Sequence, residues 1–228
     1  MKKAMKNVFL VLGLATMFSG CFAGGYHYEP PNLTPPDISE CTIEINRNID
    51  AVWRAIILVV NDIDLNILRW HSGSKDLHLV YLSFRTHNPT DYCDCGKVQT
   101  YIKNAKVRRD YNFPAASKNQ LYEFVNEGQL IKVQREVFLS GEVKITLHEL
   151  LNDHTKVKVM IKYVLTKNTT VVNDVAETIP STHLPSKNYF TSTTLGTDSN
   201  QIICRSTLAL EKSILYTINE YANKYINR

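Results

Sequence analysis

The side chains of this sequence best suited to chemistry are its five cysteines and seven histidines. A thiolate acts as a nucleophile, a metal ligand or a disulfide partner, and a catalytic thiolate needs a base such as histidine beside it. The histidines are dispersed, and the sequence contains no glycine-rich phosphate loop, no His-Glu-x-x-His pair and no Gly-x-Ser-x-Gly turn. His148 lies at an outward position of a predicted strand, which favours a surface residue over a general base. We therefore expect no catalytic residues, no cofactor and no enzyme activity.

Cys21 closes an N-terminal leader. Three lysines lie among the first six residues, an apolar run follows over residues 8–18, and Ser19 and Gly20 come directly before the cysteine. This order is typical of a secretory signal. With a cysteine at its end it resembles the lipobox of bacterial lipoproteins, in which a peptidase cuts before the cysteine and the thiol carries diacylglycerol; Phe18 stands where leucine is usual. The resemblance implies a signal peptide at residues 1–20 and lipid attachment at Cys21.

Two alternatives to a lipoprotein are an ordinary cleaved signal peptide and a membrane-spanning anchor. The apolar run of about 11 residues is shorter than the roughly 20 that a spanning helix needs. A protein with one acyl chain leaves its membrane readily, whereas one with two or more stays attached. By analogy with lipoprotein sorting in enteric bacteria, Phe22 in place of aspartate favours the outer membrane. We therefore expect an outer-membrane lipoprotein, held through acylated Cys21, with its domain facing the periplasm.

The four remaining cysteines predict two disulfides, because an even number of cysteines in an exported protein is typical of such bonds. They are Cys41, Cys93, Cys95 and Cys204, and three pairings are possible. A ring closed by Cys93 and Cys95 would be strained, so we favour Cys95 with Cys204 and Cys41 with Cys93. The alternatives are a metal site built from the Cys-Asp-Cys stretch with Cys204 and a histidine, and Cys95 as a nucleophile. Zinc sites more often separate paired cysteines by two or more residues, so we expect no metal.

Length and charge indicate one folded unit without affinity for nucleic acid. The chain has 228 residues, and removal of residues 1–20 leaves enough for a single domain. The leader takes away three of the 26 basic residues and no acidic one, so 23 basic residues remain against 22 acidic ones. The mature chain is thus close to neutral, and its charge gives no case for a nucleic-acid partner.

We expect a proline- and glycine-rich tether at residues 21–39 and a single globular domain at residues 40–228. Val52, Ile56 and Val59 form one face of a predicted helix at residues 49–62, which Asn46 or Asn48 can cap. Strands are predicted at residues 41–45, 65–70, 77–84, 143–147, 157–165 and 169–178. A last hairpin is predicted over residues 189–204, before a closing helix that Ser206 or Thr207 caps and whose stripe includes Leu210, Ile214 and Ile218. Residues 85–130 are expected to be irregular, and their basic cluster of Lys103, Lys106, Arg108 and Arg109 is interpreted as solvated charge, with an anionic contact as the alternative.

This order of elements places an antiparallel sheet over helices, so the expected fold class is α+β, helix-grip-like, with a long C-terminal helix. It is similar to the repeated domain of the small lipoprotein subunit of the outer-membrane β-barrel assembly machinery. Two motifs also resemble a set of uncharacterised Gram-negative lipoproteins: Asp94-Cys95-Gly96, and Cys204-Arg205-Ser206-Thr207 followed by Leu210-Glu211, with Leu208 where that pattern usually has glycine. The resemblance covers residues 40–84 and 140–226 as architecture. It implies a structural or adaptor role.

Three functions follow from the sequence. The first is a lipid-anchored structural or adaptor component of an envelope assembly, with an unidentified envelope protein as partner. The second is a periplasmic carrier that holds an apolar ligand or lipid between the sheet and the closing helix, in a cavity lined by Tyr163, Tyr221 and Tyr225. The third is an enzyme or redox protein. A cavity under the last helix would favour the carrier, a filled core with an exposed apolar patch would favour the adaptor, and clustered titratable groups in a cleft would favour the enzyme.

Overall fold

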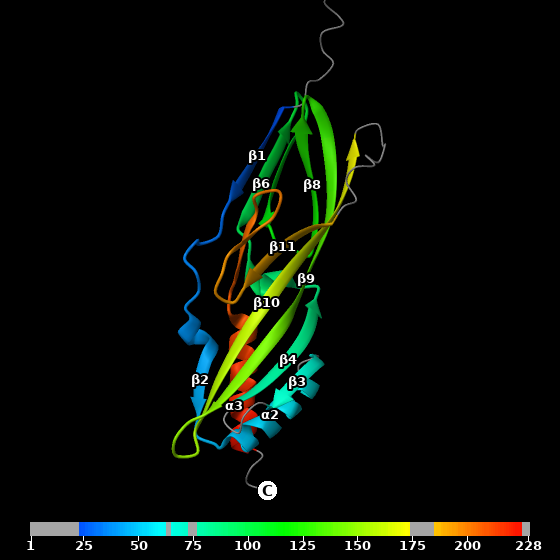
Figure 1. Ribbon diagram of the computed structural model, residues 1–228. Coiled ribbons are helices and arrows are strands. Elements are labelled where there is room, and N and C mark those ends of the chain that lie inside the picture. The colour runs from blue at the N-terminus through cyan, green and yellow to red at the C-terminus, as the bar shows by residue number, and fades with distance from the viewer. Residues whose placement is uncertain (1–22, 63–64, 73–76, 174–184, 225–228) are drawn as a thin grey trace, which may run out of the picture.

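The computed structural model describes residues 23–62, 65–72, 77–173 and 185–224. The molecule is elongated, and its longest strands run diagonally along the body (Figure 1). The first described strand, β1 (Ala23–Glu29), lies at one end, and the helices α2 (Ile49–Asp62) and α3 (Ala209–Lys224) lie at the other. Cys21, the predicted lipid attachment site, lies outside the described residues.

The fold is β-rich, so the prediction of an α+β, helix-grip-like fold is wrong. Strands account for 55% and helices for 20%, and the part of the chain that the structure describes contains only two α-helices. Most of the difference comes from residues 85–130. This stretch was expected to be irregular, yet it forms β5 (Cys93–Asp94), β6 (Lys97–Lys103), β7 (Arg108–Pro114) and β8 (Asn119–Asn126).

Two long antiparallel strands form the spine of the molecule. β9 (Gln129–Glu149) and β10 (Thr155–Asn173) pair along their whole lengths, from Thr155 opposite Glu149 to Asn173 opposite Ile131. At about 3.4 Å per residue, β9 spans about 70 Å. The other strands of this seven-stranded sheet are β2 (Thr42–Ile45), β3 (Asn66–Ser72), β4 (Leu77–Thr86), β8 and β11 (Ser186–Thr191).

The two helices cover one face of one half of this sheet, which we call the helix half. Asn48 Oδ1 accepts the Ala51 N–H at 2.9 Å and caps α2, and the predicted stripe of Val52, Ile56 and Val59 is fully buried. Leu210, Ile214 and Ile218 of α3 are buried beside it, against the inward side chains of β9 and β10. The helix predicted at residues 49–62 is therefore confirmed, and so is the closing helix.

A second sheet covers the other half of the spine, which we call the sheet half. It consists of β1, β6 and β7 in the order β1-β6-β7, and β8 lies against it. A small apolar cluster of Tyr122, Ile131 and Val133 fills the space between the sheets. Because residues 23–29 pair with β6 in this sheet, that part of the expected tether belongs to the folded body.

A small three-stranded sheet joins the two halves. It contains β12 (Gly196–Thr197), β13 (Ile203–Ser206) and β5, in the order β12-β13-β5. The expected hairpin over residues 189–204 takes a different form, because β11 pairs with β10 and β13 pairs with β5 and β12. Two short 3₁₀ helices, η1 (Ile38–Cys41) and η2 (Pro89–Asp91), precede β2 and β5.

Candidate functional site

The disulfide between Cys95 and Cys204 is present, and the predicted bond between Cys41 and Cys93 is not. Cys95 and Cys204 are 109 residues apart in sequence, and their bond ties the start of the second sheet to the strand that leads into α3. Cys41 and Cys93 are buried free thiols, so that part of the prediction is wrong. An even number of cysteines in an exported protein predicts disulfides. Only the fold determines which sulfur atoms lie within bonding distance.

Neither free thiol is poised for nucleophilic chemistry. Burial raises the pKa of Cys41 to about 11, with the Glu211 carboxylate acting in the same direction. Burial likewise raises the pKa of Cys93 to about 12, and its thiol donates to the carbonyl oxygen of Pro89 at 3.2 Å. Both groups are therefore thiols at neutral pH, whereas the thiolate is the reactive form. The alternative roles of Cys95 as a nucleophile or a metal ligand fail because its sulfur is bonded to Cys204, and the described residues contain no group of three or more His, Cys, Asp or Glu side chains that could hold a metal ion.

The head of α3 contains a buried polar cluster that the sequence did not reveal. Glu211 is fully buried and accepts hydrogen bonds from the Tyr163 hydroxyl at 2.9 Å and from the Ser206 hydroxyl at 3.2 Å. Ser206 in turn accepts the N–H of Leu208 at 2.9 Å. Leu208 has a φ of 62°, in the left-handed region that favours glycine, at the position where the resembled motif usually has glycine. This cluster fixes the start of the helix, where a carboxylate is favoured by the helix dipole.

The space between α3 and the sheet is filled by side chains. Tyr163, which was expected to line a cavity there, is only 1% exposed; its ring stacks on Phe190 at 5.0 Å and meets the edge of Phe84 at 5.8 Å between centroids. Gly141 lies opposite both Tyr163 and Phe84, and a Cβ atom there would approach the Phe84 ring to 2.7 Å. The missing side chain makes room for this aromatic layer. Tyr221 is half-buried against the core, and Tyr225 lies outside the described residues.

The face of the helix half that the helices leave uncovered is the broadest candidate surface. Figure 1 shows β4, β9 and β10 in front of α3, so this face turns toward the viewer. We call it the open face, and none of the described helices or strands packs over it. Its outward side chains are Leu79, Tyr81, Ser83 and Arg85 on β4; Ser140, Glu142, Lys144, Thr146 and His148 on β9; and Lys156, Lys158, Met160, Lys162 and Val164 on β10. The position predicted for His148, outward on a strand, is confirmed.

The open face is basic although the mature chain as a whole is near neutral. Six basic side chains lie on or beside it, namely Arg69, Arg85, Lys144, Lys156, Lys158 and Lys162. Its two acidic residues each face a lysine on the next strand, Glu142 opposite Lys162 and Glu44 opposite Lys156. The arginines lie over aromatic rings, Arg69 over Tyr81 and Arg85 over Phe138, both at 4.3 Å. Among the described residues none of the four lysines forms an ion pair, and Glu44 pairs with His154 instead. Lys144 and Lys158 differ from the other two lysines because neither lies opposite a carboxylate in the sheet.

The open face is also hollowed and partly apolar. A hollow of about 580 Å³ crosses its strands at the level of Gly141, where Ser140, Lys162, Val164 and Tyr189 line it. Tyr189 is 62% exposed, while Leu79, Tyr81 and Met160 are half-buried between the basic residues. An apolar centre surrounded by a polar rim is the usual arrangement of a protein-docking surface.

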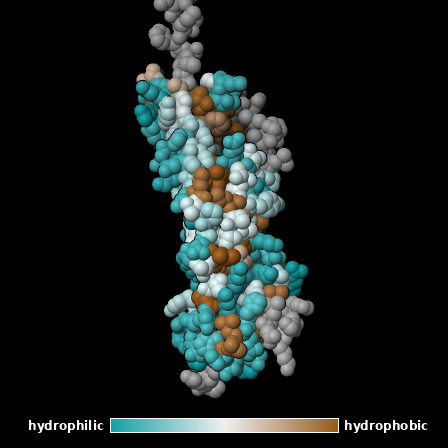
Figure 2. All heavy atoms as spheres, turned by 60° about the vertical axis from the view of Figure 1, so that its left-hand side comes forward, coloured by the Kyte–Doolittle hydropathy of each residue, from teal (hydrophilic) through white to brown (hydrophobic). Residues whose placement is uncertain are grey.

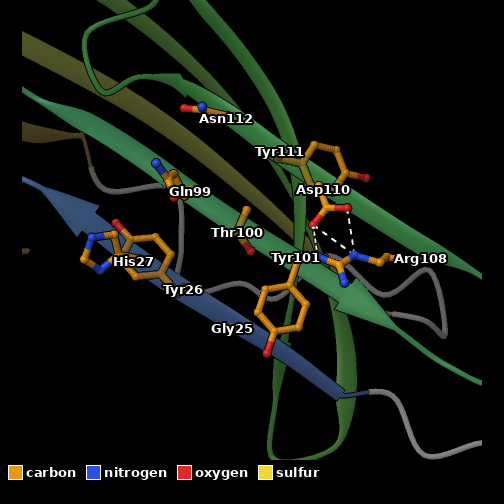
Figure 3. A pocket seen from close by; sticks show the side chains of 10 residues that line it. All are labelled: Gly25, Tyr26, His27, Gln99, Thr100, Tyr101, Arg108, Asp110, Tyr111 and Asn112. Atoms are coloured by element: carbon orange, nitrogen blue, oxygen red, sulfur yellow. Dashed lines mark hydrogen bonds and ion pairs between the residues drawn. The ribbon is translucent and has the colours of Figure 1, made fainter.

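A second hollow, of about 480 Å³, lies on the outer surface of the β1-β6-β7 sheet (Figure 3). Tyr101 lies across Gly25, where a Cβ atom would come within 2.5 Å of its ring. Arg108 and Asp110 form a forked ion pair beside it, with Nε to Oδ2 at 2.9 Å. The hollow is therefore polar and its principal charges are already paired.

Ion pairs hold the two arginines of the predicted basic cluster. Arg108 is held by Asp110, and Arg109 Nε lies 3.2 Å from Glu123 Oε2. Lys103 and Lys106 are exposed at the end of the molecule that carries Ala23, since Lys103 pairs with Ala23 in the sheet. The arrangement favours solvated charge, as the sequence predicted, over a concentrated anion site.

Figure 2 shows the side of the molecule that carries β1 and β2. Apolar atoms form several separate spots along its length, divided by hydrophilic surface. Such scattered exposure is normal for a folded protein and does not by itself mark an interface. The open face is distinguished by its charge rather than by hydrophobicity.

Comparison of the chain with models of protein families, with curated proteins and with solved structures finds no match. Within the described residues, no helix has both the length and the apolar character needed to cross a membrane. The candidate site is therefore defined by its geometry and charge. The sequence signal for it was the row of lysines alternating with buried residues in β10, which indicates an exposed strand face but not that the face stays uncovered.

Proposed function

We propose that this chain is a lipid-anchored lipoprotein of the outer membrane that acts as a structural or adaptor component of an envelope assembly. The leader ending in Cys21 supports the anchor, and the absence of aspartate at residue 22 supports the outer membrane. The open face carries the adaptor role. It is a broad surface with six basic side chains and few acidic ones, and the partner that fits it is a protein with an acidic surface.

The shape of the molecule supports this role. Ala23 follows Cys21 by two residues and lies at one end of the body, while the open face lies toward the other (Figure 1). A strand of about 70 Å connects these regions. An anchored molecule would thus present the open face away from the bilayer, where a second envelope protein can reach it. The filled space under α3 argues against the carrier, because that function needs a cavity there.

The anchor is tested by mass spectrometry of the protein isolated from envelope fractions. We expect the chain to begin at Cys21, with the thiol and the new amino group acylated. A chain that begins elsewhere, or that carries a free thiol at Cys21, would contradict the anchor without bearing on the open face.

The adaptor role is tested by affinity purification of the full chain in a mild detergent. The variant Lys144→Glu with Lys158→Glu reverses the two lysines of the open face that lie opposite no carboxylate, and Lys103→Glu with Lys106→Glu is a matched control at the opposite end. We expect the wild type and the control to recover the same membrane protein, and the open-face variant or raised salt to lose it, because screening and charge reversal weaken an ionic contact. A partner that remains with the open-face variant would contradict the docking surface. Copurified lipid without a protein would favour the carrier.

A further inference from the structure

A cleft in the sheet half has an arginine on its floor. The cleft has a volume of about 580 Å³ and lies between β1 and the segment 198–202, with β8, β9 and β10 beneath it. Its walls are largely aromatic or aliphatic and include Tyr26, Tyr122, Phe124, Val171 and Ile202. Arg135 lies on β9 among them. We call this the arginine cleft; it lies away from the open face and the α3 cluster.

Every hydrogen-bond acceptor that Arg135 contacts is uncharged. Its Nε donates to Thr169 Oγ1 at 3.3 Å, one terminal nitrogen donates to Gln120 Oε1 at 3.4 Å, and the other donates to the Tyr122 hydroxyl at 2.9 Å. A guanidinium has five N–H donors, so these contacts use three of them, and the described residues leave one N–H without an acceptor on each terminal nitrogen. Two such donors in a plane match the two oxygens of a carboxylate or of a phosphodiester.

The charge of Arg135 is not neutralised by the described residues. A neighbouring ion pair joins Lys167 to Asp198, whose atoms Nζ and Oδ2 are 2.7 Å apart and whose side chains are 2% and 0% exposed. Asp198 is fully engaged, because its other oxygen accepts the N–H groups of Asn200 and Ile202. Burial lowers the pKa of Lys167, and the positive charge of Arg135 acts in the same direction. Two cations thus share one carboxylate, which leaves one positive charge in excess beside an apolar wall.

We propose that the arginine cleft binds a monoanionic group, a carboxylate or a phosphodiester, attached to an apolar body. The anionic group takes the two free N–H donors of Arg135, and the apolar body lies against the aromatic walls. One excess charge matches a monoanion, whereas a dianion would bring a charge that nothing here balances. The proposal is independent of the lipid anchor and of the open face.

The test measures binding of three small probes to the purified full chain in a mild detergent, by saturation-transfer NMR with the same detergent without protein as the blank. Octanoate supplies a carboxylate, dibutyl phosphate a phosphodiester, and 1-octanol the apolar body without charge. We expect at least one anion to bind about tenfold more tightly than 1-octanol, because the bonds to Arg135 are charge-assisted. Tighter binding of octanoate would indicate a carboxylate ligand, and tighter binding of dibutyl phosphate would indicate a lipid headgroup. If the two anions bind equally, the cleft recognises the single negative charge and not the kind of anion.

The variant Arg135→Gln should reduce anion affinity to that of 1-octanol while leaving 1-octanol binding unchanged. Arg85→Gln is the matched control, because both arginines lie over an aromatic ring, Arg135 over Tyr122 at 5.6 Å and Arg85 over Phe138 on the open face. If Arg135→Gln fails to fold, Ser199→Trp at the exposed rim of the cleft should block all three probes instead. The proposal is overturned if no probe binds, if the anions and 1-octanol bind equally, or if the control loses as much affinity as Arg135→Gln.

Discussion

The helix half and the sheet half bury different kinds of side chain on the same two strands. In the helix half, β9 presents Val143, Ile145 and Leu147 to the helices, and all three are fully buried. In the sheet half the inward positions of β9 hold Ile131, Val133 and Arg135, of which the arginine is only partly buried. The strand is continuous, so the change comes from what covers it: helices with aliphatic stripes on one half, and the β1-β6-β7 sheet on the other.

The two halves also differ in the polar groups that they bury. The sheet half encloses Gln120, Glu123, Lys167 and Asp198 next to a small apolar cluster. In the helix half the main buried carboxylate is Glu211, which has two hydroxyl donors and a helix N-terminus. Apolar burial supplies most folding free energy, whereas buried charges add little net stability and require partners. The contrast indicates that stability is concentrated in the helix half, whereas the sheet half holds the charged groups on which the proposed arginine cleft depends.

The largest effect is expected from Asp198→Ala in the sheet half. The substitution leaves Lys167 buried without a counter-charge, close to Arg135, and should lower the free energy of unfolding by about 4 kcal/mol. Urea denaturation at neutral pH measures this as a shift of the midpoint without a change in slope. Glu220→Ala is the control, because its ion pair with Lys224 is exposed and should contribute less than about 1 kcal/mol. Similar losses for the two variants would contradict the account.

The same variant should show a characteristic pH dependence. Burial lowers the pKa of Lys167 below its ordinary 10.5, while Asp198 raises it. Between the folded pKa and 10.5 the unfolded chain binds more protons, so stability attributable to this group rises with pH in that window. Removal of Asp198 lowers the folded pKa further and widens the window downward. Asp198→Ala should therefore regain part of its lost stability as pH rises toward 10.5, which denaturation at several alkaline pH values would detect.

The next largest effect is expected from loss of the disulfide that joins the two halves. The double substitution Cys95→Ala with Cys204→Ala opens a covalent loop of about 100 residues and should lower the free energy of unfolding by about 3 kcal/mol. Chemical denaturation with and without a reductant provides the measurement, because the wild type should fall to the level of the variant when reduced. Cys41→Ala offers a comparison at a buried free thiol. If reduction leaves the wild type unchanged, the bond does not stabilise the fold.

A direct comparison of the halves uses two isoleucines on β9. Ile145 is fully buried in the helix half, and Ile131 is 6% exposed in the small cluster of the sheet half. Substitution by alanine costs about 2 to 5 kcal/mol depending on how far the site relaxes. We expect a loss of about 3 kcal/mol for Ile145→Ala and about 2 kcal/mol for Ile131→Ala in the same denaturation assay. Equal losses of stability, or a larger loss for Ile131→Ala, would show that stability is not concentrated under the helices.

The sequence predicts the helix half better than the sheet half, and for a physical reason. Val52, Ile56 and Val59 repeat with helical spacing, and Val157, Val159 and Ile161 alternate, so their periods identify the elements directly. In β6 the buried positions are Val98, Thr100 and Ile102, whose alternation includes a threonine. With a polar residue in the middle of the buried set, the period was too weak to separate a strand from a loop.

Other features of the sheet half depend on contacts between distant residues. The glycines of β1 suggested a linker, but Gly25 is needed because the ring of Tyr101 lies across it. Lys167 and Asp198 are 31 residues apart and each reads as a surface charge until the fold pairs them. Arg135 likewise has no local signal, since its partners lie on two other strands, β8 and β10. Residues of this kind become visible only when the tertiary structure is known.

The smallest predicted effect concerns the carboxylate of the helix half. Burial raises the pKa of Tyr163, as does the nearby charge of Glu211, so its hydroxyl remains a donor to Glu211 at every pH at which the protein is studied. Tyr163→Phe removes that donor but leaves the Ser206 hydroxyl and the helix N-terminus, so the loss should be about 1 kcal/mol. It should also be smaller than that of Asp198→Ala, because Glu211 keeps partners whereas Lys167 would have none. Denaturation of both variants in one buffer measures the ratio, and a larger loss for Tyr163→Phe would show that the helix half depends on a polar contact as strongly as the sheet half does.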